Sequence, residues 1–92
     1  MPTILSKIKS HVRAGNWKAE EHALNELQKD GFTVADAKHA ILSAWEFDEL
    51  TDDPSQVRYV LFGQAIDDRP LVIVVFSRGR SVRIKTAYEP QI

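Results

Sequence analysis

The chain has 92 residues, of which 43% are hydrophobic and 27% are charged, and its formal net charge is −1. This length and composition are typical of an ordinary folded protein, so we expect a single domain over residues 1–92. The absence of cysteine excludes disulfide bonds, thiolate metal sites and a cysteine nucleophile. No stretch approaches the roughly 18 apolar residues of a membrane span, and the N-terminus lacks the apolar run of a signal peptide. We therefore expect a cytoplasmic protein that does not associate with membranes.

The N-terminal half of the chain has the periodicity of helices. Apolar residues at spacings of three and four predict an amphipathic helix from about Thr3 to Ala14, within an N-terminal segment of residues 1–16. A second helix is expected from about Lys18 to Lys29, and a third from about Thr33 to Ser43. Both should bury one apolar stripe. Its members are Ala23, Leu24 and Leu27 in the second helix, and Val34, Ala37, Ile41 and Ala44 in the third.

Two local signals mark the junction between the second and third helices. Gly31 after Asp30 suits the left-handed conformation that ends a helix, and Phe32 is placed to pack back onto the last turn. Thr33, followed three residues later by Asp36, resembles a capping box with Asp in place of the usual Glu. The sequence therefore predicts that the second helix ends at this point and that the third helix begins directly after it.

From Trp45 the pattern changes to alternation, which predicts a first strand as far as Leu50. A second strand is expected over Val57–Ala65, with Gly63 as a bulge. Leu71–Phe76 is an unbroken apolar run, typical of a strand buried on both faces. Val82–Ala87 alternates again and forms the last strand. Helices followed by strands with short connections predict an α+β fold, with three N-terminal helices on a four-stranded antiparallel meander in the order 1-2-3-4.

The charges are divided between the two halves. Residues 1–56 contain six Lys and Arg against ten Asp and Glu, whereas residues 57–92 contain six against three. Guanidinium groups gathered on one sheet could bind phosphate or an acidic partner. The alternative is that they solvate one face of the sheet and protect its edges from pairing with other chains.

Few residues suit catalysis. The chain has no glycine-rich phosphate loop, no pair of histidines at metal-binding spacing and no serine in an elbow motif, which excludes the commonest nucleotide and zinc enzymes. His22 lies in the first turn of the second helix, where the positive end of the helix dipole favours a neutral imidazole that can act as a base. The alternative is an ordinary surface contact with Glu26, four residues later.

The basic residues of the second half come from adjacent strands or from the hairpin that joins them. They are Arg58, Arg78, Arg80, Arg83 and Lys85. Several of them could converge on an RNA backbone, and Tyr59 and Tyr88 could supply a stacking surface or a proton donor. Metal-free RNA cleavage needs a base, an acid and a cation on the phosphate, and this set contains all three kinds of group.

The order and spacing of several short motifs resemble the domain-of-unknown-function family 4258. The motifs are His22-Ala23, Asp30-Gly31-Phe32-Thr33-x-x-Asp36, the strand from Arg58 to Gly63, Arg69-Pro70-Leu71-Val72-Ile73-Val74, and Thr86-Ala87-Tyr88-x-Pro90. The resemblance runs from about Trp17 to Pro90. It implies a fold and activity like those of the RelE-, MqsR- and BrnT-like toxins, which cut RNA without a metal or cofactor and pair with a cognate antitoxin. By position it points to His22, Arg58, Thr86 and Tyr88.

The chain departs from the family pattern along its second helix. The family has arginine at the positions of Glu26 and Asp30, and two anions there would repel a phosphate. Either phosphate binding relies on the strand arginines alone, or the activity is lost.

Two hypotheses follow. The first is a toxin-family endoribonuclease of mRNA, weak or degenerate, with His22 as base, Tyr88 as acid or stacking group, and Arg58, Arg78 and Arg83 on phosphate. The second is a non-catalytic module of the same fold that binds protein or nucleic acid.

Overall fold

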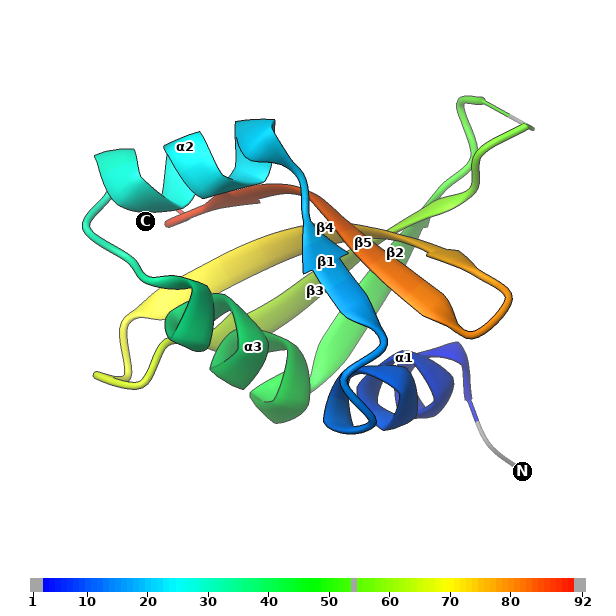
Figure 1. Cartoon of the computed structure of the whole chain (residues 1–92), viewed down its shortest axis with the longest axis horizontal. Helices are drawn as coiled ribbons and strands as arrows, with labels where there is room; N and C mark the ends of the chain where they lie inside the picture. Colours follow the sequence, from blue (N-terminus) through cyan, green and yellow to red (C-terminus); the bar gives the residue numbers. More distant parts are fainter. Residues whose placement is uncertain (1–2, 54, 91–92) are drawn as a thin grey trace.

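A computed structural model describes residues 3–53 and 55–90 (Figure 1). Within these residues, three helices and five strands follow one another. The elements are α1 (Ile4–Arg13), β1 (Trp17–Ala19), α2 (Glu21–Lys29), α3 (Val34–Ser43), β2 (Glu46–Leu50), β3 (Arg58–Gln64), β4 (Pro70–Arg78) and β5 (Ser81–Tyr88). In the part of the chain so described, no helix is long and apolar enough to cross a membrane.

The strands form one five-stranded mixed sheet in the order β1-β5-β4-β3-β2. β2, β3, β4 and β5 are antiparallel neighbours, but β1 pairs in parallel with β5, with Trp17 opposite Val82 and Ala19 opposite Ile84. The expected four-stranded antiparallel meander is therefore wrong. The error has a physical cause, since a strand of three residues shows no visible alternation and its partner lies at the far end of the chain.

The extra strand also moves the start of the second helix. Residues 17–19 were expected near or within that helix, but they are extended, and α2 begins at Glu21. The backbone N–H of Glu20 donates to the carbonyl of Ile84 at 3.0 Å, so the chain stays on the edge of the sheet until the helix begins. α2 then packs beside β5 (Figure 1).

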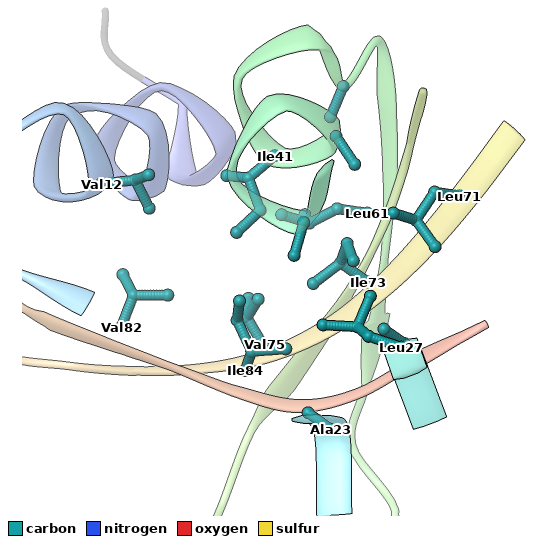
Figure 2. Close-up of a cluster of buried hydrophobic side chains, with 14 of the residues drawn as sticks. Val12, Ala23, Leu27, Ile41, Leu61, Leu71, Ile73, Val75, Val82 and Ile84 are labelled. Carbon is teal, nitrogen blue, oxygen red and sulfur yellow. The ribbon is translucent and has the colours of Figure 1, made fainter. Parts of the chain in front are cut away.

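β4 lies at the centre of the sheet and contains the apolar run Leu71–Phe76. All five residues from Leu71 to Val75 are buried, as the unbroken apolar pattern predicted. Leu71, Ile73 and Val75 belong to the core cluster that includes buried side chains of all three helices (Figure 2). Val72 and Val74 point to the other face and are not part of that cluster.

The junction between α2 and α3 has the two predicted signals. Gly31 has a φ of +78°, the N–H of Phe32 donates to the carbonyl of Leu27 at 2.8 Å, and Phe32 is buried. Thr33 and Asp36 form a complete capping box at the start of α3. Both predictions are confirmed.

Two further contacts fasten this junction to the β3–β4 turn. The Arg69 guanidinium lies 4.1 Å from the centre of the Phe32 ring and donates to the carbonyls of Asp30 and Gly31 at 3.4 and 3.2 Å. The Asp36 carboxylate accepts from the backbone N–H of Ile66 at 3.0 Å. The hydrogen bond from the Thr33 backbone has the largest effect and lowers the pKa of Asp36; burial opposes it, and the hydrogen bond from the Ile66 backbone lowers the pKa further.

Three other local expectations are wrong. Gly63 pairs regularly with Leu71 and forms no bulge; it is needed because a Cβ there would lie 1.9 Å from the Ala40 carbonyl oxygen of α3. The pairing of β4 with β5 is instead irregular between Val74 and Val75, where the register shifts. Leu24 and Val34, expected to face inward, are 38% and 42% exposed.

Candidate nucleic-acid interface

One face of the sheet is turned away from all three helices. The buried side chains of α1, α2 and α3 form a single cluster with alternate residues of the strands, such as Leu61, Ile73 and Ile84. The residues between them point the other way because side chains alternate across a strand. We call this second surface the open face. It carries Lys18 of β1, Glu46, Asp48 and Leu50 of β2, Arg58, Val60 and Phe62 of β3, Val72, Val74, Phe76 and Arg78 of β4, and Arg83, Thr86 and Tyr88 of β5, with Lys85 at the register shift of β5.

The register arranges these residues in rows across the sheet. Phe76 pairs with Arg58 on one side and with Arg83 on the other. Side chains directly opposite one another on neighbouring strands lie about 5 Å apart at Cβ, so Phe76 has an arginine as its cross-strand neighbour on each side. At the other end of the open face, Val72 pairs with Phe62 and with Tyr88.

A pocket of about 400 Å³ lies next to the Phe76 row, where β4 and β5 meet at their hairpin. Its lining consists of Gln56, Phe76, Arg78, Ser81, Arg83 and Lys85. Three cations, one amide, one hydroxyl and one aromatic ring line it, and no carboxylate from the described residues does. This is a suitable surface for a phosphate group beside a stacked ring. We call it the hairpin pocket.

The cations of the open face differ in how far they are already neutralised. Arg58 donates to Asp52 at 2.6 Å, and Lys85 and Arg83 lie 3.1 and 3.8 Å from Glu20. Arg78 has no ion pair within residues 3–53 and 55–90, and neither has Arg80. Both lie beside the hairpin and are exposed. The free positive charge is therefore concentrated at the hairpin end of the sheet.

Tyr59 is not part of this surface. As the neighbour of Arg58 it points to the helix side of the sheet, where its ring meets Phe47 edge-on at 6.2 Å between centroids. The structure thus separates Tyr59 from the other residues proposed to bind RNA. The strand was predicted correctly, but alternation along it places neighbouring residues on opposite faces.

The three proposed catalytic groups do not surround one point. Tyr88 is 42% exposed and lies four residues along the sheet from the row of Arg58, which corresponds to about 13 Å. His22 is the second residue of α2 and is exposed, and no hydrogen bond or ion pair joins it to Glu26 in the part of the chain that the structure describes. Neither His22 nor Tyr88 lines the hairpin pocket.

His39, which lies on α3, is used within the fold. Its Nδ1 lies 2.8 Å from the carbonyl oxygen of Gln64, to which Ser43 also donates. His39 therefore helps to hold α3 on β3. Across residues 3–53 and 55–90, no group of three or more histidine, aspartate or glutamate side chains is placed to hold a metal ion.

Sequence reasoning missed four residues of this site. Phe76 was assigned to the buried run, and its place between two arginines depends on a register that the sequence does not reveal. Gln56 and Ser81 flank the pocket from a loop and from the start of β5. Glu20 was regarded as part of a helix, and its contact with Lys85 joins residues 65 positions apart.

A family model described as a domain of unknown function (DUF4258) matches residues 20–89, which is most of the chain. The chain belongs to this family. No curated protein and no solved structure matches it. The DUF4258 region begins at Glu20 and includes every residue of the hairpin pocket. It leaves out α1 and β1, so the parallel edge strand lies outside the matched region.

Proposed function

We propose that this DUF4258 protein binds single-stranded RNA on the open face of its sheet. The observation that carries the proposal is the hairpin pocket, which combines Arg78, Arg83 and Lys85 with Phe76 and is lined by no carboxylate among residues 3–53 and 55–90. Phosphate contacts supply most of the affinity of a protein for nucleic acid, and aromatic side chains on a sheet bind unstacked bases.

The geometry favours a single strand over a duplex. Phe76 is partly exposed between Arg58 and Arg83, so a base can stack on the ring while the phosphates on either side meet a guanidinium. Bases in a duplex are stacked on one another and cannot reach such a ring. Phe62 and Tyr88 extend the aromatic surface along the same face.

The salt dependence of RNA binding tests the proposal. For single strands the logarithm of the binding constant falls with a slope of about 0.7 for each phosphate contact, so three cations predict a slope of about −2. Arg78→Ala and Arg83→Ala should each weaken binding about fivefold, or roughly 1 kcal/mol, and make the slope shallower. Phe76→Leu keeps the apolar volume but removes the ring, and should cost about tenfold at all salt concentrations.

Arg13→Ala is the matched control, because Arg13 ends α1, is exposed and carries the same charge. Equal weakening by Arg13→Ala and Arg83→Ala would refute a localised site. Failure to bind any single-stranded RNA at low salt would refute the proposed function. A tight complex with a protein that is disrupted by Glu26→Arg with Asp30→Arg would favour the protein-binding alternative.

RNA cleavage is the second candidate, and one observation favours it. The resemblance to RelE-, MqsR- and BrnT-like toxins implies that Thr86 and Tyr88 belong to a catalytic site. Both residues lie on the same face of the sheet as Arg58. In such a toxin His22 would take the 2′-hydroxyl proton, Tyr88 would protonate the leaving oxygen, and an arginine would stabilise the phosphate. A cognate antitoxin would be the partner of this form of the protein.

The cleavage hypothesis needs its own experiment. Purified protein should fragment RNA in the presence of a chelator, and His22→Ala and Tyr88→Phe should each lower the rate by a factor of about 100 or more. Equal rates for the three proteins would remove the catalytic assignment while leaving RNA binding intact. Because Tyr88 lies about 13 Å along the sheet from the arginine row, binding is the stronger of the two candidates.

A further inference from the structure

Glu20 is paired with two of the basic side chains that would bind a phosphate. Its carboxylate lies 3.1 Å from the Lys85 ammonium and 3.8 Å from the Arg83 guanidinium. These are two of the three cations that line the hairpin pocket. Glu20 itself does not line that pocket; it lies at the junction of β1 and α2 and lines a second pocket, which shares Arg83 with the first. Its side chain thus bridges the phosphate-binding surface and the first turn of a helix.

The Glu20 carboxylate has an alternative binding position at the N-terminus of α2. Glu20 is the N-cap residue of α2, yet its side chain makes no capping hydrogen bond. The first N–H groups of a helix lack partners within the helix, and an anion near them is stabilised by the helix dipole. The backbone of Glu20 is fixed to the sheet through Ile84, so only the side chain has to rotate.

We propose that Glu20 is an internal competitor of the RNA phosphate, an inference that rests on the proposed function. In the free protein the carboxylate neutralises Lys85 and Arg83. When RNA binds, a phosphate takes over both cations and the carboxylate turns to the N-terminal turn of α2. Glu20 therefore lowers the affinity of the open face for polyanions, and RNA binding changes the surroundings of the first turn of α2, which carries His22.

Removing the carboxylate should have two effects on RNA binding. Glu20→Gln should bind a single-stranded RNA of 12 nucleotides about fivefold more tightly at about 0.1 M salt, the change expected from losing a partly exposed ion pair. The salt slope should also become steeper. Salt weakens the contacts of Glu20 as well as those of the RNA, and in the natural protein these two effects partly cancel.

Glu21→Gln is the matched control. It removes the same charge one residue away, but Glu21 has no ion pair within the described parts of the chain. Any general effect of net charge is the same in both variants, so the difference between them measures the contact itself. Adding Lys85→Met to Glu20→Gln gives a double-mutant cycle, in which the gain from Glu20→Gln should shrink towards that of the control, because only the longer contact of Glu20 with Arg83 remains.

Glu20→Ser guards the test against misfolding. It also removes the carboxylate, and serine is a preferred N-cap residue, so α2 should be at least as stable as in the natural protein. Thermal unfolding of each variant shows that the fold is kept. Tighter RNA binding by both Glu20 variants and not by Glu21→Gln supports the proposal.

The failure of this inference can be told apart from failure of the proposed function. RNA binding that depends on Arg78 and Arg83, together with equal affinities of Glu20→Gln and Glu21→Gln, would overturn the competitor role alone. Absence of RNA binding in the natural protein and in Glu20→Gln, even at low salt, would overturn the proposed function and this inference with it.

Discussion

Replacing Arg69 by alanine should loosen the junction between α2 and α3 without touching the open face. The guanidinium stacks on Phe32, donates to the carbonyls of Asp30 and Gly31, and pairs with Asp67 at 2.7 Å. The stacking contributes about 0.5 to 1 kcal/mol. The exposed ion pair contributes less than about 1 kcal/mol, and the two long hydrogen bonds together contribute about 1 kcal/mol.

These contributions predict that Arg69→Ala lowers the free energy of unfolding by about 2 kcal/mol, or about 8 to 16 °C in Tm for a chain of this size. The measurement is urea and thermal unfolding followed by circular dichroism. Arg80→Ala is the control, since Arg80 is exposed and should change the stability by less than about 0.5 kcal/mol. Arg69→Lys keeps the charge but not the planar stack and should recover less than half of the loss. Equal stability of Arg69→Ala and Arg80→Ala would refute the conclusion that Arg69 stabilises the junction between α2 and α3.

Three further predictions concern the fold. Ile73→Ala should lower the free energy of unfolding by about 3 to 4 kcal/mol, and Val74→Ala by only about 1 to 2, because Ile73 lies in the helix-covered core and Val74 on the open face; equal losses in denaturant unfolding would contradict this. Gly63→Ala should prevent α3 from seating on β3 and cost more than about 3 kcal/mol; a near-native Tm would show that the helix can shift freely. The lowered pKa of Asp36 means that its contribution is complete above the ordinary value of 3.8 and is lost as the pH falls through the lowered pKa. The difference in stability between the natural protein and Asp36→Asn should therefore be constant near neutral pH and shrink only below about pH 4, and a difference that shrinks near pH 6 would point to another group.

Features set by neighbours in the chain could be predicted from the sequence. The junction between α2 and α3 is such a feature. The end of α2 at Gly31, the packing of Phe32 and the start of α3 after Thr33 each depend on residues within one or two helical turns. The run Leu71–Phe76 needs only its own composition to indicate burial on both faces. These interactions are short in sequence, so the pattern that specifies them is complete in one stretch.

Features that depend on distant partners could not be predicted in the same way. The strand Trp17–Ala19 is too short to show a period, and it exists because β5 offers it an edge. The contact of Glu20 with Lys85 has the same origin. The separation of Tyr59 from Arg58 is different, because strict application of alternation to the predicted strand would have placed them on opposite faces.

The parallel pairing of β1 with β5 means that β1 is synthesised early but can join the sheet only after the end of the chain has been made. Trp17 leaves the ribosome early, but its partner Val82 is among the last residues to emerge. Contacts so far apart in sequence form slowly because a long loop must first be closed. During synthesis the antiparallel strands β2, β3 and β4 can pair with one another while β1 is still without its partner strand β5. The open face acquires Arg83 and Lys85 only when β5 takes its place between β1 and β4, so a nascent or C-terminally truncated chain should present no complete hairpin pocket.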